Sequence, residues 1–180
     1  DKQRRPVMLV GVWVNITRRK TAELRAAEDR DLFHTLIEHI PDSIYFKNRE
    51  SRFVLANTAT ANKLGVPTPA DLTGRTDDYF FDQTMSDVSR KEELDIMATG
   101  RPIRARLHHE TWLHKDDSWS QISKFPWYGR NGDLKGIVGI SSDVTKLVKT
   151  EIKATETARI LEERNKSLEK EIDSVSYTHL

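Results

Sequence analysis

The pattern of apolar and polar positions predicts a small α+β domain between two charged helices. Residues 17–40 are rich in charged residues and contain no glycine or proline, which favours a helix that ends at Pro41. Five short stretches with alternating polarity follow, and turn-forming residues separate them. The predicted strands cover residues 43–47, 52–57, 103–114, 118–128 and 134–143. Helices are predicted at residues 59–64 and 83–99, between the second and third strands, so we expect a five-stranded antiparallel sheet.

The third predicted strand has one apolar and one polar face. Its polar face carries His108, Glu110 and His114, for which a solvent-exposed position is favoured and a ligand or metal role is the alternative. A zinc-protease motif is excluded, because it needs two histidines four residues apart on a helix, and Leu113 occupies the position that His109 would require. No metal site is therefore expected. The apolar face carries Ile103, Ala105, Leu107, Thr111 and Leu113.

Turn chemistry explains several other polar residues. Asn131 and Gly132 predict a tight hairpin in which both residues have positive φ. The acidic pairs at residues 77–78 and 116–117 fall in predicted turns, where short polar side chains are common.

An internal repeat predicts the domain boundaries. Residues 11–18 (GVWVNITR) resemble residues 139–146 (GISSDVTK), and in both an apolar strand runs through Asn or Asp and Thr into a charged helix. We interpret the first copy as the end of a truncated preceding domain. The expected order is a C-terminal strand of that domain at 1–17, a connecting helix at 18–40, a complete domain at 41–145, an output helix at 146–174 and a non-native tail at 175–180.

The helix after residue 145 carries a heptad pattern. One series of positions runs through Leu161 and Leu168, and a second runs through Ala158 and Asn165. This spacing predicts a parallel two-stranded coiled coil in which Asn165 fixes the register. The alternative is a single amphipathic helix that packs on its own domain. The expected dimer contacts are Leu147, Ala158, Leu161, Asn165, Leu168 and Ile172.

Composition narrows the function classes. Lys and Arg number 29 against 28 Asp and Glu, and no basic patch is interleaved with aromatic residues, so nucleic-acid binding is not expected. The chain has no cysteine, which excludes disulfides and thiolate catalysis and is consistent with the cytoplasm. The apolar run at residues 7–14 is shorter than the roughly 20 residues of a membrane helix, so no membrane contact is expected in this fragment, although the parent protein can be anchored upstream. No nucleophile–base pair or phosphate loop indicates catalysis within the fragment.

Several short motifs in this order resemble the PAS family of sensor domains. The match covers roughly residues 32–145. It ends in a triplet, DVT, that resembles the junction between the sheet and the output helix in that family. The motifs are residues 40–47 (IPDSIYFK), 51–53 (SRF), 56–57 (AN), 72–77 (LTGRTD), 99–102 (TGRP), 136–140 (GIVGI) and 143–145 (DVT).

The resemblance implies a PAS fold, flanked by long signalling helices, that binds a small ligand or dimerises. Asp143, Val144 and Thr145 are then the residues that transfer the signal to the output helix. A short polar side chain at Asp143 can cap that helix. The ligand-pocket candidates are Phe46, Phe53, Leu55, Leu94, Met97, His109 and Trp127, and an aromatic residue among them can equally be plain core.

The resemblance also implies which cofactors and which parent protein to expect. A cysteine-linked flavin is not expected because there is no cysteine, and haem is not expected because the predicted helix at 83–99 has no histidine. The ligand stays unknown. The expected parent is a bacterial sensor histidine kinase of a two-component system that acts as a homodimer. The alternatives are a diguanylate cyclase and a purely dimerising module without a ligand.

The heptad pattern predicts that Leu161→Asp combined with Leu168→Asp abolishes dimerisation, because both charges would lie in the apolar seam. Analytical ultracentrifugation of the wild type and the double variant measures this. A wild type that is monomeric at high concentration, or a double variant that remains dimeric, would contradict the seam.

Overall fold

The computed structural model describes residues 17–177 of the chain, and the side chains of residues 20–170. The strand predicted before residue 17 and the side chains of the predicted tail lie outside this part. The chain divides after His39 into two units, of which the first contains helix α1 (Thr17–His39). None of the helices within the described range combines the length and the apolar character that a membrane span requires.

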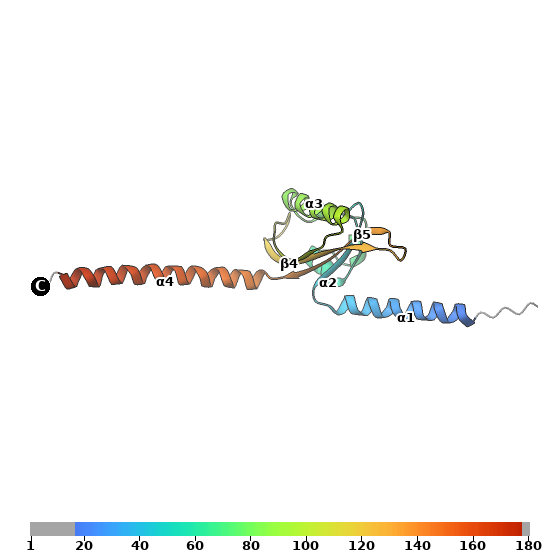
Figure 1. Cartoon of the computed structure of the whole chain (residues 1–180), viewed down its shortest axis with the longest axis horizontal. Coiled ribbons are helices and arrows are strands. Elements are labelled where there is room, and N and C mark those ends of the chain that lie inside the picture. The colour runs from blue at the N-terminus through green and yellow to red at the C-terminus, as the bar shows by residue number, and fades with distance from the viewer. Residues whose placement is uncertain (1–16, 178–180) are drawn as a thin grey trace, which may run out of the picture. The chain divides into compact units, whose positions relative to one another are not determined.

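The second unit is a sheet with helices on one face, and its last strand leads into a long helix (Figure 1). The strands are β1 (Ser43–Asn48), β2 (Phe53–Ala56), β3 (Ile103–Glu110), β4 (Ser118–Tyr128) and β5 (Leu134–Asp143). The helices are α2 (Thr58–Leu64), α3 (Gln83–Thr99) and α4 (Thr145–Tyr177), with the 3-10 helices η1 (Pro69–Leu72) and η2 (Asp77–Tyr79). The strands are antiparallel in the order β2-β1-β5-β4-β3, which confirms the predicted fold class.

Short polar residues and glycines begin and end the helices. Asn57 caps α2 by accepting a hydrogen bond from the backbone N–H of Thr60, and its Oδ1 also accepts from the N–H of Ile44 on β1 at 3.0 Å. Asp82 caps α3 in the same way through Met85. Gly100 ends α3 in the left-handed conformation, with φ 70. Because Asn57 bonds both α2 and β1, its cap also ties the start of α2 to the sheet.

The predicted polarity of β3 is wrong, because the strand contains a β-bulge. The register shifts between Ile103 and Arg106, and Ala105 adopts a positive φ of 46. One extra residue exchanges the two faces of a strand, so the positions beyond the bulge point opposite to the expectation. His108 and Glu110 are buried, at 7% and 3% exposure, while Leu107 is 50% exposed. The strand also ends at Glu110 instead of residue 114.

The loop between β4 and β5 is longer than the predicted two-residue turn. The N–H of Gly132 donates to Gly129, and the N–H of Gly129 donates to Asp133. Gly132 has a φ of 80, but Asn131 does not have a positive φ. The expectation of positive φ at both residues is therefore wrong, and only the glycine supplies it.

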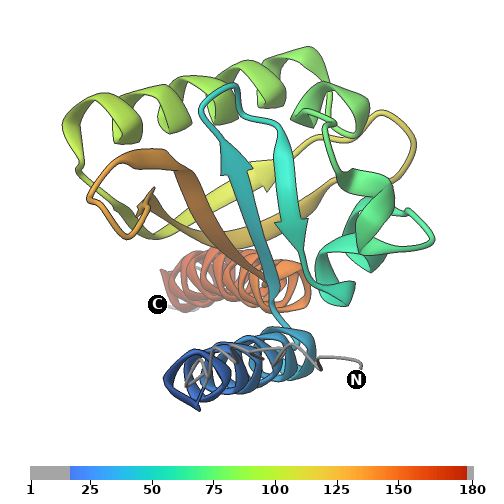
Figure 2. The same ribbon diagram turned by 90° about the vertical axis from the view of Figure 1, so that its right-hand side faces the viewer.

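Helix α3 covers one face of the sheet (Figure 2), and buried charged side chains lie on this face. Lys47 on β1 and Lys124 on β4 point into it, and each has 1% exposure. A cluster of apolar side chains fills the space next to these charges. Its buried members are Phe53, Ala56, Leu72, Phe80, Phe81 and Met85. The domain therefore combines an apolar core at one side with buried charged groups at the other.

Candidate functional site

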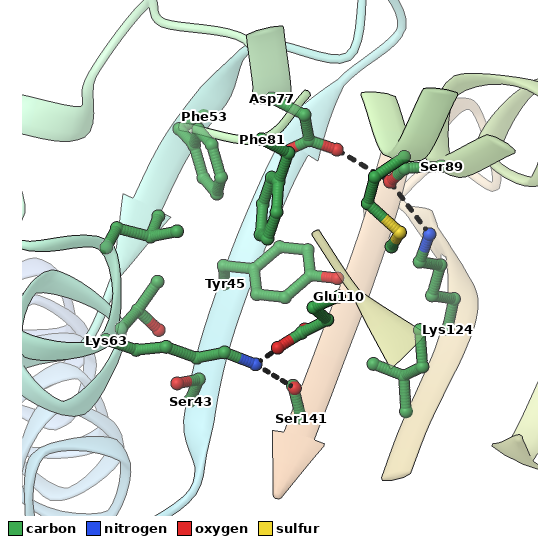
Figure 3. Close-up of a pocket in the computed structure, with 14 residues that line it drawn as sticks. Ser43, Tyr45, Phe53, Lys63, Asp77, Phe81, Ser89, Glu110, Lys124 and Ser141 are labelled. Atoms are coloured by element: carbon green, nitrogen blue, oxygen red, sulfur yellow. Dashed lines mark hydrogen bonds and ion pairs between the residues drawn. The ribbon is translucent and has the colours of Figure 1, made fainter. Parts of the chain in front are cut away.

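A small cavity lies between the sheet and the helices that cover it (Figure 3). About 40 Å³ of it is open to the centres of water molecules, which is room for a few waters or the polar end of a small ligand. Tyr45, one of its lining residues, lies against Gly139 of β5, where any Cβ would overlap the tyrosine ring. The lining residues are Ser43, Tyr45, Phe53, Thr60, Lys63, Leu64, Asp77, Phe81, Met85, Ser89, Glu110, Ile122, Lys124 and Ser141.

One end of the cavity is organised by Lys63, the last polar residue of α2. Its ammonium donates to Glu110 at 2.8 Å and to the hydroxyls of Ser120 and Ser141 at 2.7 Å each. The second oxygen of Glu110 accepts from Ser118 and Ser120, both at 2.9 Å. Lys63 therefore joins α2 to three strands of the sheet, β3, β4 and β5, at one point.

Asp77, Ser89 and Lys124 line the other end, and Lys47 lies behind them. Its ammonium donates to Asp77 of η2 and to Glu93 of α3, both at 2.6 Å. The hydroxyl of Ser89 donates to the second oxygen of Asp77 at 2.6 Å. Lys124 donates to Ser89 at 3.0 Å. These contacts connect β1, η2, α3 and β4 through buried polar atoms.

Glu92 extends this group toward the edge of the sheet. Its carboxylate accepts from Lys124 at 3.0 Å and lies 3.1 Å from Nε2 of His108. Burial alone would raise the pKa of Glu92, but the hydrogen bond from His108 and the charge of Lys124 outweigh it and lower the pKa from 4.5 to about 2. Glu92 is therefore a carboxylate that stays charged in moderate acid.

The buried charges at Lys47 favour their ionised forms. Burial alone would lower the pKa of Lys47, but Asp77 and Glu93 outweigh it and hold this pKa above its ordinary value of 10.5. Burial alone would raise the pKa of Asp77, but Lys47 and the Ser89 hydroxyl outweigh it and keep the pKa below 3.8. Burial, reinforced by Glu93 and nearby carboxylates, raises the pKa of Tyr45 well above 10.0, so its phenol stays neutral in the cavity.

Of the seven ligand-pocket candidates, Phe53 lines the cavity and the other six are not among its lining residues. Leu55 and Leu94 are 38% and 47% exposed. Phe46 packs edge-on against Trp127, with ring centroids 5.3 Å apart. The remaining two are half-buried Met97 and largely exposed His109, which stacks on Trp119 with centroids 4.7 Å apart.

The sequence interpretation missed the charged residues of the cavity. The acidic pair at 77–78 was assigned to turn chemistry, yet Asp77 is buried and bound to Lys47. A signal was present, because Lys47 and Lys124 occupy the strand positions that alternate with outward-facing residues and share a face with Tyr45 and Ile122. Within the described part of the chain, no group of three or more His, Asp or Glu residues could hold a metal ion.

The three junction residues connect α4 to the neighbouring strand β4. The side chain of Asp143 accepts from the N–H of Thr145 at 2.8 Å. The N–H of Val144 donates to the carbonyl of Trp119 at 2.9 Å. The hydroxyl of Thr145 accepts from the N–H of Trp119 at 2.8 Å, so it bonds the sheet instead of capping the helix.

The seam candidates lie on α4, which is one continuous helix. Leu147, Leu161 and Leu168 are 67%, 56% and 47% exposed in the single chain. Ala158 and Asn165 are exposed as well. The side chain of Ile172 lies outside the described residues.

We expect the free energy of unfolding to fall between about pH 5 and pH 2 because of Glu92. A carboxylate with a depressed folded-state pKa stabilises the fold above its unfolded pKa, and this contribution is lost as the pH falls toward the folded value. The shift to about 2 corresponds to about 3 kcal/mol. Glu92→Gln should therefore lower stability at pH 7 and flatten its dependence on pH below about 5, as measured by urea unfolding at several pH values.

Glu163→Gln is the matched control, because Glu163 pairs with Arg159 on the exposed surface of α4. We expect it to change the stability by less than about 0.5 kcal/mol at every pH. An acid transition that is the same in Glu92→Gln and in the wild type would show that Glu92 does not carry this dependence.

Comparison with known proteins identifies related chains. The chain matches the family described as PAS fold over residues 37–149. It is similar to the methanogenesis regulatory histidine kinase FilI of Methanothrix harundinacea, with 23% identity over 129 residues. This match covers 72% of the chain but 14% of FilI, so the chain spans a small part of that relative.

Solved structures with a similar fold include the VqmA dimer of Vibrio cholerae, at a TM-score of 0.57 and 22% identity over 67% of this chain and 52% of that one. The PAS domain of BvgS from Bordetella pertussis has a TM-score of 0.53 and 24% identity over 72% of this chain and 98% of that domain. A PAS domain from Colwellia psychrerythraea has a TM-score of 0.53 and 17% identity over 64% of this chain and 97% of that one. At these identities the likeness concerns the fold. Because the family match covers more than half of its residues, the chain belongs to the PAS fold family.

Proposed function

We propose that this PAS domain is a sensor that binds a small polar ligand in its inner cavity and passes the effect of binding to α4. The observation that carries the proposal is the position of Lys63. Its ammonium lines the cavity and bonds Ser120 and Ser141, which lie on the two strands next to the start of α4. A ligand that competes for Lys63 therefore acts on the part of the sheet that holds the output helix.

The route from the cavity to the helix is short. Ser120 is next to Trp119, whose carbonyl accepts from the N–H of Val144 and whose N–H donates to the hydroxyl of Thr145. Ser141 lies two residues before Asp143 on the same strand. Ser141 therefore lines the cavity close to the α4 junction, and Ser120 pairs with Asp143 across β4 and β5, which supports signal transfer through this point.

A homodimer through α4 is part of the proposal. The exposed leucines at 147, 161 and 168 occupy one heptad series, and a second copy of the same helix would bury all three. Asn165 lies in the other series, where a polar pair across a parallel dimer fixes the register. The VqmA neighbour from Vibrio cholerae is itself described as a dimer.

The proposed output domain follows α4 and is a histidine kinase. The relative FilI is named as a regulatory histidine kinase, and the present chain corresponds to a small part of it. A dimeric helix that leaves a sensor domain suits this role, because it can carry a rotation or shift to a catalytic domain at its far end.

The cavity predicts that ligand binding is blocked by a larger side chain at Ser141. A thermal-shift screen of small polar metabolites against the 180-residue chain should yield at least one compound that raises the melting temperature. Ser141→Leu should remove that shift, because the leucine fills the cavity. Ser142→Leu is the matched control, since the same side chain is placed one residue along on the other face of β5. A shift that survives in Ser141→Leu would place the ligand elsewhere, and a screen without any binder would favour a purely dimerising domain.

The junction predicts that Asp143→Ala changes signal output without unfolding the domain. Loss of the bond to the N–H of Thr145 should cost about 1 kcal/mol, which is small against the stability of a domain. The measurement uses residues 1–174 joined in heptad register to the catalytic part of a sensor histidine kinase. Autophosphorylation should change several-fold in Asp143→Ala. Asp133→Ala is the control and should leave it unchanged, because Asp133 lies on the β4–β5 loop and pairs with Lys135. Unfolding by Asp143→Ala would make the residue structural, and unchanged output would exclude the junction as the coupling point.

A further inference from the structure

A second pocket lies outside the inner cavity, where the β1–β2 turn faces the first half of α3. It encloses about 380 Å³ and is lined by Ser51, Ser86, Arg90 and Glu93, among others. Asp77 lines both this pocket and the inner cavity. Asp77 is the one residue that the two lining sets share.

Three buried side-chain oxygens of residues that line this pocket lack hydrogen-bond partners. Ser51, Ser86 and Glu93 are 3%, 6% and 0% exposed. Within the described part of the chain, the buried side-chain oxygens without a hydrogen-bond partner are Oγ of Ser51, Oγ of Ser86 and Oε2 of Glu93. All three residues line the same pocket. Native proteins seldom leave buried polar atoms unpaired, and three at one place indicate a ligand that supplies hydrogen-bond donors.

The charges around the pocket favour a cation. Five acidic residues line it against two arginines. Arg52 donates to the backbone carbonyl of Gly74, and Arg90 donates to that of Glu50, so these contacts leave carboxylates uncompensated. The Glu93 carboxylate bonds the ammonium of Lys47, which it shares with Asp77. A positively charged ligand would balance this excess.

The spacing of the unpaired atoms favours an extended organic cation over a single ion. Ser86 and Glu93 are seven residues apart on α3, which places their Cα atoms about 10 Å apart on one side of the helix. No group of three or more acidic or histidine side chains among the described residues could chelate a metal. We propose that this pocket binds a small aliphatic amine, with a primary ammonium at Glu93 and a second donor that reaches Ser86. The pocket shares only Asp77 with the inner cavity, so the proposal does not depend on whether that cavity senses a ligand.

The test uses isothermal titration calorimetry on the 180-residue chain at low ionic strength, with 1,4-diaminobutane as the probe. Tetramethylammonium supplies charge without N–H donors, and 1,4-butanediol supplies donors without charge. We expect saturable binding of the diamine and at least about tenfold weaker binding of both other compounds, because charge-assisted hydrogen bonds need both properties. Absence of diamine binding, or equal binding of all three compounds, would overturn the proposal.

Two variants locate the site. Glu93→Gln should weaken diamine binding by about tenfold or more, since it removes the buried charge. Ser86→Ala should weaken it about two- to tenfold and leave the melting temperature of the free protein unchanged or higher, because an unpaired buried hydroxyl is removed.

Ser89→Ala is the stability control, because it lies one turn further along α3 and its hydroxyl bonds Asp77 and Lys124. We expect it to lower the melting temperature. If Ser86→Ala also lowers the melting temperature and no diamine binds, the pocket holds only water and the proposal is wrong.

Discussion

The arrangement of this domain depends on the ion pairs that the buried ammonium of Lys47 makes with two carboxylates. Lys47 lies on β1 with 1% exposure and bonds Asp77 and Glu93, which come from η2 and α3. Removing one partner of a buried pair leaves an uncompensated charge and typically costs about 3–5 kcal/mol. Helix α3 is therefore held over the sheet by paired charges at its centre, while the apolar cluster around Phe53 supports the other side of the domain.

Charged groups also bound the inner cavity. This space is bounded by two ammonium groups, Lys63 at one end and Lys124 at the other, each already bonded to a carboxylate. The charged groups that the proposed ligand would contact are already paired with opposite charges. This favours a small polar molecule over an apolar or strongly charged one.

The sequence predicted those features that depend on neighbouring residues. The bounds of α3, β4 and β5 agree with the expected ranges, because alternation, caps and glycine stops are local signals. The bulge at Ala105 was not predicted, since one extra residue in a strand leaves no mark on composition. The buried charges were missed for a different reason. Lys47 finds its partners 30 and 46 residues away, and only the folded sheet brings them together.

The connection between the sheet and α4 consists of few and weak interactions. Val144 and Thr145 bond the backbone of Trp119, and hydrogen bonds of this kind contribute about 1 kcal/mol each. Such energies are small against a domain stability of about 5–15 kcal/mol, but about 1.4 kcal/mol shifts a two-state balance tenfold. Ser120, next to Trp119, is held by Lys63 and Glu110 from the cavity side. A change at Lys63 therefore needs to disturb only one strand segment to alter how α4 is held, and it can do so while the paired charges around Lys47 keep the domain folded.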